Sequence, residues 1–140
     1  MFARSEHTTQ RQDARAGFTL IELLIVVVII GVLASIAIPK FAATKEKAYL
    51  AKLKGDLRNM MTAQEAYSAD NQTYYGGAVP SLQLAYSPSS GVVITIVQAV
   101  PGGWSATATM PAMTPRTCAV FIGAAAPVAP AVSDGVIACN

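Results

Sequence analysis

The longest feature in the pattern of apolar and polar positions is an unbroken apolar run. From Phe18 to Ile38 every residue is apolar or small, with the exception of Glu22. A helix of this length rises about 30 Å, the thickness of a bilayer's hydrocarbon core. The run therefore predicts a membrane-length helix. A carboxylate inside such a helix is costly, and this marks Glu22 as a candidate functional residue.

After Pro39 the apolar residues become periodic. They recur at intervals of three and four, as on one face of a helix. This face comprises Glu46, Leu50, Leu53, Leu57, Met60, Gln64 and Tyr67. Most charged residues, Asp56 among them, fall off it. The pattern predicts one helix from Phe18 to about Ala69, with an amphipathic second half.

Gly31 and Pro39 bracket the weakest stretch of this helix. Glycine costs about 1 kcal/mol in a helix interior and proline about 3 kcal/mol. Proline also leaves one backbone carbonyl without its donor, which the Ser35 hydroxyl could partly replace. Two interpretations stay open: Pro39 only kinks the helix, or the stretch from Gly31 to Pro39 can unwind.

The C-terminal half of the sequence predicts strands. Turn-forming residues occupy positions 71–91, and three β-prone segments follow at Val92–Val97, Trp104–Met110 and Thr117–Ile122. We expect an antiparallel sheet of three or four strands, packed on the helix face from Leu50 to Tyr67, which is an α+β fold. The Ala/Pro segment 123–130 has few large side chains, and we expect it not to pack deeply.

Composition excludes most enzyme classes. The only histidine, His7, precedes the apolar run, and no nucleophile motif, phosphate-binding loop or paired carboxylates occur. We expect no catalytic residue, no metal site and no cofactor. Outside residues 1–17 there are seven basic and six acidic residues, too small an excess to indicate DNA as a main partner.

A known family shares the N-terminal pattern. A polar leader ending in Gly17, then Phe-Thr-Leu-Ile-Glu and a long apolar helix, resembles the class III signal sequence of type IV pilins and their relatives. The resemblance is close over residues 16–41. It implies that a prepilin peptidase cleaves between Gly17 and Phe18 and methylates the new amine. Pro39 matches the family's helix-kinking proline.

The resemblance also gives Glu22 a partner. It would be the fifth residue after cleavage, a position that the family keeps acidic. No other charged side chain lies between Phe18 and Ile38. We therefore expect Glu22 to pair with the amine of Phe18, in its own chain or in an adjacent subunit. The alternative is a carboxylate that reaches the membrane surface and assists only insertion or peptidase recognition.

The two cysteines, Cys118 and Cys139, lie near the C-terminus. Behind an export-type N-terminus, such a pair predicts one disulfide formed outside the reducing cytoplasm. It would close a loop of about 21 residues, worth about 3 kcal/mol by chain entropy. A disulfide-closed C-terminal loop resembles type IVa major pilins, in which this loop lies on the filament surface.

The function implied is that of a structural subunit. It would wait in the inner membrane and then be assembled, by the pilus machinery, into a helical homopolymer of identical subunits. The extracellular pilus, or fimbrium, would serve adhesion, twitching motility or DNA uptake. Two alternatives stay open: a type II secretion pseudopilin, whose major form typically has a calcium site in place of the disulfide, and a minor, DNA-binding pilin.

Five segments follow from this interpretation. They are a leader at 1–17, a membrane and filament-core helix at 18–39, an amphipathic helix at 40–70, a connecting loop at 71–91, and the sheet with its disulfide region at 92–140. Two observations oppose it. An ordinary signal peptide could use Ser35-Ile36-Ala37 as its cleavage site. The basic residues after the run also outnumber those in the leader, which by the positive-inside rule favours the reverse orientation.

Overall fold

The structure is a computed structural model that describes residues 17–111 and 116–140. Expectations for the leader before Gly17 lie outside the described residues. The chain divides after Pro39 into two compact units. We call the described residues 17–39 the apolar unit and residues 40–140 the folded unit.

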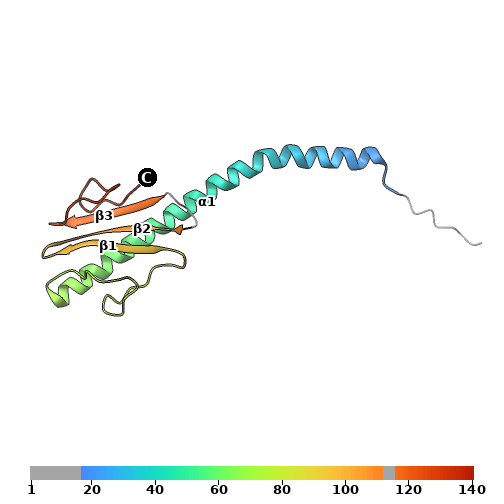
Figure 1. Ribbon diagram of the computed structural model, residues 1–140. Coiled ribbons are helices and arrows are strands. Elements are labelled where there is room, and N and C mark those ends of the chain that lie inside the picture. The colour runs from blue at the N-terminus through green and yellow to red at the C-terminus, as the bar shows by residue number, and fades with distance from the viewer. Residues whose placement is uncertain (1–16, 112–115) are drawn as a thin grey trace, which may run out of the picture. The chain divides into compact units, whose positions relative to one another are not determined.

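A single helix, α1, runs from Leu20 to Asn71 and contributes to both units (Figure 1). The predicted long helix is thereby confirmed, with Pro39 inside it. Its C-terminal end is closed locally, because the Asn71 Nδ2 donates to the Tyr67 carbonyl at 2.9 Å. Gln72 follows with a positive φ of 56°, a conformation that ends a helix.

The sheet of the folded unit has four antiparallel strands in the order β1-β2-β3-β4. They are β1 (Val93–Val100), β2 (Gly103–Thr109), β3 (Thr117–Gly123) and the two-residue β4 (Ala138–Cys139). The three sequence-predicted strands correspond to β1, β2 and β3. The returning C-terminal tail supplies β4, which pairs with β3.

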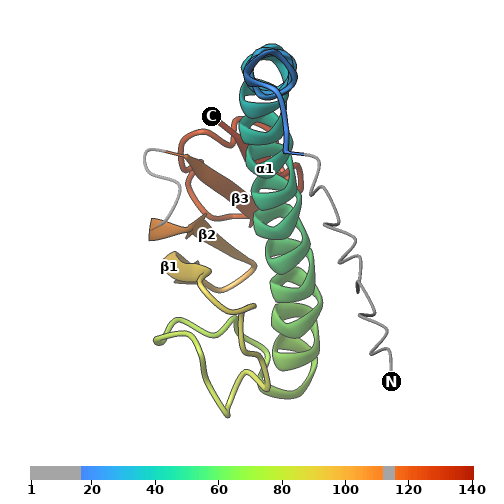
Figure 2. The same cartoon turned by 90° about the vertical axis from the view of Figure 1, so that its right-hand side faces the viewer.

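The second half of α1 packs on one face of this sheet (Figure 2). Leu53, Leu57 and Met60 of the helix are fully buried, as is Trp104 of β2. The central strand β2 otherwise presents alanines to the helix, and such small residues leave room for it to approach. The predicted helix face is confirmed, and it forms the main core of the fold.

The opposite face of the sheet differs from expectation at one residue. The Ala/Pro segment 123–130 is mostly exposed, in line with expectation, but Ala125 is an exception and is only 5% exposed. The neighbouring Ala131 packs with Phe121 in a second, smaller cluster. Small side chains let the backbone come close here: a Cβ added at Gly103 would collide with the backbone nitrogens of Ala124 and Ala125. The tail therefore forms a third layer over the sheet.

Candidate functional site

The first turn of α1 holds Glu22 by hydrogen bonds. The Thr19 backbone N–H and hydroxyl both donate to Oε2 of Glu22, each at 2.8 Å. The Glu22 backbone N–H donates in return to the Thr19 hydroxyl at 3.2 Å. This reciprocal arrangement is a capping box, which satisfies backbone N–H groups that a helix start leaves without partners. In the uncut chain Glu22 therefore has a neutral partner, Thr19.

Sequence reasoning missed this role of Thr19, although Thr-x-x-Glu before an apolar run is a recognised signal for a helix start. The hydroxyl and N–H of Thr19 are neutral, so they do not show up among the charged groups that could pair with Glu22. The pairing of Glu22 with a Phe18 amine stays a prediction, because this chain has a peptide bond at that position.

The candidate cleavage junction lies just outside the helix. Gly17 and Phe18 precede α1 and are exposed, with Phe18 91% exposed. A peptide bond in an exposed segment outside a helix is open to a peptidase in a way that a helical bond is not. The local conformation is thus compatible with cleavage at Gly17–Phe18.

The apolar unit buries almost nothing of its own. Its large apolar side chains are all at least 50% exposed. The helix is long and apolar enough, by length and composition, to cross a membrane. Exposed apolar surface on this scale marks contact with a membrane or another protein.

Gly31 and Pro39, which bracket the predicted weak stretch, both lie within the continuous helix α1. A Cβ added at Gly31 would meet nothing within 4 Å, so this chain alone gives no packing reason for glycine there. The Ser35 hydroxyl donates to the Val32 carbonyl at 2.7 Å. The hydroxyl thus binds the carbonyl of the preceding turn. It does not donate to the carbonyl of residue 35, which lacks a donor because Pro39 has no N–H.

In the folded unit, Asp56 anchors the connecting loop to α1. The sequence pattern placed it off the buried face, and this is wrong: Asp56 is only 3% exposed. Its carboxylate accepts from the Ser89 hydroxyl at 2.9 Å and from the Ser89 N–H at 3.2 Å. The Tyr86 hydroxyl donates to the Asp56 carbonyl at 3.0 Å. These bonds compensate the cost of burying a carboxylate.

Burial, followed by the negative charge of Asp56 beside it, raises the pKa of Tyr86 well above its usual range. Both causes disfavour the phenolate. A second loop contact lies further along the helix, where the Gln64 side-chain amide exchanges two hydrogen bonds with the Tyr75 backbone, at 2.8 and 2.9 Å. The connecting loop is thus fixed to α1 at two places.

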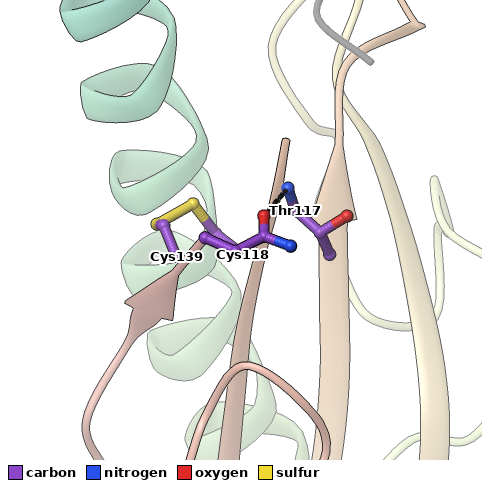
Figure 3. Close-up of a disulfide and its surroundings, with 4 residues drawn as sticks. Thr117, Cys118 and Cys139 are labelled. Carbon is purple, nitrogen blue, oxygen red and sulfur yellow. Dashed lines mark hydrogen bonds between the residues drawn. A yellow bond between two sulfur atoms is a disulfide. The ribbon is translucent and has the colours of Figure 1, made fainter. Parts of the chain in front are cut away.

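The predicted disulfide joins Cys118 of β3 to Cys139 of β4, which are directly opposite in the antiparallel register (Figure 3). The closed loop spans 21 residues, as expected. Beside it, the Thr117 N–H donates to the Asn140 side-chain carbonyl at 2.8 Å, and the Asn140 N–H donates to the Thr117 carbonyl at 3.2 Å. The tail is thereby tied down at its end.

The loop that the disulfide closes is also tied to the sheet along its length. The Gly123 N–H donates to Oδ1 of Asp134 at 2.9 Å, and the Gly135 N–H donates to the Phe121 carbonyl at 2.9 Å. The Ala126 N–H donates to the side chain of Gln98 in β1 at 2.8 Å. This loop presents a fixed surface.

No arrangement suited to catalysis is found in the part of the chain that the structure describes. That part contains no group of three or more His, Cys, Asp or Glu side chains able to hold a metal ion. A hollow of about 540 Å³ lies in the connecting loop around Pro80, Leu82 and Tyr86. It offers hydroxyls and apolar side chains but no acid–base pair.

Comparison with known proteins places the first half of the chain. The family model described as "Prokaryotic N-terminal methylation motif" matches residues 13–38. The chain is 44% identical to the type II secretion system core protein G of Escherichia coli K12 over 62 residues, 44% of this chain and 43% of the other. It is 39% identical to the type IV major pilin protein PilA of Myxococcus xanthus over 75 residues, 54% and 33% of the two chains.

A third relative matches over a longer region. The type IV wide pilus major component PilA4 of Thermus thermophilus is 40% identical over 85 residues, 59% of this chain and 64% of that protein. The chain thus spans between a third and two thirds of these relatives. These relatives are named as a pilin, a major component of a pilus and a core protein of a secretion system. The chain carries the prokaryotic N-terminal methylation motif, and over part of its length it is similar to type IV pilins and to the core protein G of type II secretion systems.

Proposed function

We propose that this chain is the precursor of a type IV pilin-like filament subunit. The observation that carries the proposal is the N-terminal segment: a methylation motif, an exposed Gly17–Phe18 junction and an apolar helix with no partner of its own. Cleavage between Gly17 and Phe18 by a prepilin peptidase, followed by methylation of the Phe18 amine, would produce the mature subunit.

Such a subunit meets two environments in turn. In the inner membrane, lipid covers the apolar unit. In the filament, the same side chains pack against identical helices, and the pilus machinery drives the exchange. A helix satisfies its backbone hydrogen bonds in both environments, so it can move from lipid into protein without unfolding.

In this proposal, Glu22 fixes the axial position of an incoming helix against its neighbour in the filament. Cleavage creates a positive amine at Phe18, next to the Thr19 that holds Glu22 in the uncut chain. An incoming subunit would slide until its amine and a neighbour's Glu22 meet, because a mismatch leaves two charges unpaired in an apolar bundle. The rival role, in which Glu22 assists only insertion or peptidase recognition, requires no contact between subunits.

The disulfide favours a pilin over a pseudopilin. Cys118 and Cys139 form a disulfide that closes the C-terminal region. By resemblance, a major pseudopilin would have a calcium site there in place of the disulfide. The similarity to core protein G keeps the pseudopilin as a second candidate. Both candidates are filament subunits held first in a membrane; they differ in the machine that the filament serves.

The test begins with the mature N-terminus. Mass spectrometry of the membrane-bound protein should find a chain that starts with N-methylated Phe18; a start at Ile38 would establish an ordinary signal peptide. Filaments sheared from the cell surface should then contain this chain as the dominant protein. If the chain is processed but absent from surface filaments, and its deletion stops protein secretion, the pseudopilin is the correct assignment.

A further inference from the structure

Four basic residues of the folded unit lie along one side of α1. Lys40, Lys47, Lys54 and Arg58 are spaced by seven, seven and four residues, and all four are exposed. At 3.6 residues per turn this spacing places them within an arc of about 40°. We call them the basic stripe. It extends for about 27 Å along the helix.

The stripe flanks the core and does not belong to it. Lys54 and Arg58 line a shallow groove of about 300 Å³ with Met61 and the tail residues 135–137. The sheet covers a different side of the helix (Figure 2). Lys52, which lies off the stripe, donates to the Ser90 carbonyl of the connecting loop at 2.5 Å. Basic residues on the two flanks of α1 thus have different surroundings.

The chain's own carboxylates do not balance the stripe. Among the described residues, no residue of the basic stripe forms an ion pair. The ion pair found in the folded unit joins Arg116 to Glu46, neither of which belongs to the stripe. The other carboxylates of the folded unit mostly accept hydrogen bonds: Asp56 from the connecting loop, Asp134 from Gly123, and Glu65 from Tyr74. These neutral donors leave the carboxylate charges in place, but Asp56 is buried and Glu46 is paired, so a second copy of the folded unit would set the exposed Glu65, Asp70 and Asp134 against four cations.

We propose that the basic stripe docks the folded unit onto anionic phospholipid headgroups while the chain is anchored in the membrane. Lys40 follows the apolar helix directly in the sequence, so the stripe begins where headgroups lie. Each basic residue near an anionic leaflet strengthens binding by about five-fold. A basic stripe far from the membrane would fit nucleic acid as well as lipid. The position of this stripe, directly after the membrane-length helix, favours lipid. The inference rests on the membrane anchoring in the proposed function and not on filament assembly.

The experiment uses the full chain in lipid nanodiscs, with a fluorophore on Ala51→Cys, between Lys47 and Lys54. Energy transfer to headgroup-labelled lipid reports how close the stripe comes to the bilayer. A label on Asn59→Cys, about 100° round the helix from Arg58, is the reference position. We expect strong transfer from position 51 in phosphatidylglycerol-containing discs, loss of it in phosphatidylcholine or high salt, and weaker transfer from position 59.

Matched variants test the stripe itself. Lys47→Gln with Lys54→Gln should weaken docking by about 25-fold, on the basis of two five-fold contributions. Lys45→Gln removes one charge only two residues from Lys47 but on the far side of the helix, and should leave docking unchanged. Lys47→Gln alone is its direct counterpart, with an expected loss of about five-fold. Thermal unfolding of each variant checks that the fold is retained.

Several results would overturn the inference. They are equal transfer in both lipids, an equal effect of Lys45→Gln and Lys47→Gln, or transfer that depends on the number of chains per disc, which would assign the stripe to a second copy. Displacement of docking by duplex DNA at physiological salt would assign it to nucleic acid. A chain that is not retained in the bilayer defeats the proposed function as well; a retained chain that does not dock defeats the stripe alone.

Discussion

The two units use one helix in opposite ways. In the apolar unit every large apolar side chain is at least half exposed, whereas Leu53, Leu57 and Met60 of the folded unit are fully buried. The folded unit has a sheet, a disulfide and an anchored loop to complete its core. The described part of the apolar unit has its backbone hydrogen bonds, a capped first turn and the bond from Ser35 to Val32, but no buried core.

This contrast separates folding from assembly. A unit with its own core keeps its structure through a change of surroundings, while a unit without one takes its stability from whatever covers it. Substitutions in the folded unit should therefore change the free energy of unfolding. Substitutions in the apolar unit that remove a contact between subunits should change assembly and leave folding intact.

The largest effect is expected at Glu22. Glu22→Ala and Glu22→Gln should both be cleaved and stay in the membrane, yet give few or no filaments, because the Phe18 amine loses its partner. Sheared-filament yield, compared with processed protein in the membrane, measures this. The thermal unfolding of the folded unit should not change.

Thr19→Val is the matched control for Glu22. It removes the hydroxyl of the capping box, at a cost of about 1 kcal/mol to the helix start, but keeps the carboxylate. It should be processed and assembled. A normal filament yield from fully processed Glu22→Ala would refute the pairing.

The next effect concerns the core of the folded unit. Leu53→Ala or Leu57→Ala should lower the free energy of unfolding by about 2–5 kcal/mol, through lost burial and the cavity left behind. Leu82→Ala changes the same side chain where it is 100% exposed, and should have almost no effect. Denaturant unfolding of the three variants makes the comparison, and similar losses at all three would mean that the core is wrongly assigned.

Removing the disulfide should cost somewhat less. Cys139→Ser should lower stability by about 3 kcal/mol, because the unfolded chain regains the freedom of a 21-residue loop. The hydrogen bonds of Thr117 with Asn140 remain and keep β4 near β3. Unfolding of the oxidised protein and of Cys139→Ser measures the difference; equal stabilities would show that these bonds alone fix the tail.

The smallest effect is the pH dependence of the connecting loop. The pKa of Tyr86 is raised in the folded state, so its contribution is complete below about pH 10, the ordinary tyrosine pKa, and is lost as pH rises toward the folded-state pKa. Tyr86→Phe should cost about 1 kcal/mol at neutral pH through its lost hydrogen bonds. It should also flatten the decline in stability at alkaline pH.

A smaller slope should survive in Tyr86→Phe. Burial, and then the neighbouring Glu65, also raise the pKa of Tyr74. An unchanged alkaline decline in Tyr86→Phe would mean that the bond to Asp56 does not hold the loop.

The elements whose signals are local could be predicted from the residues alone. The apolar run, the change to helical periodicity after Pro39 and the β-branched segments each define an element within a short window, because periodicity reflects the geometry of a single helix or strand. Thr19–Glu22 belongs to this class, since its spacing was readable, even though it was overlooked. Cleavage at Gly17–Phe18 and the partner of Glu22 remain predictions, because both need a second molecule.

The features that join distant segments could not be predicted in this way, because they depend on which residues the fold brings together. Asp56 is buried because Tyr86 and Ser89, some thirty residues later, donate to it. Ala125 of the Ala/Pro segment is buried where Gly103, on another strand, leaves room for the backbone of Ala124 and Ala125. No periodicity within α1 or within the tail carries this information. A polar residue or a small one is placed by the partners that the fold brings to it, and those partners lie far away in the chain.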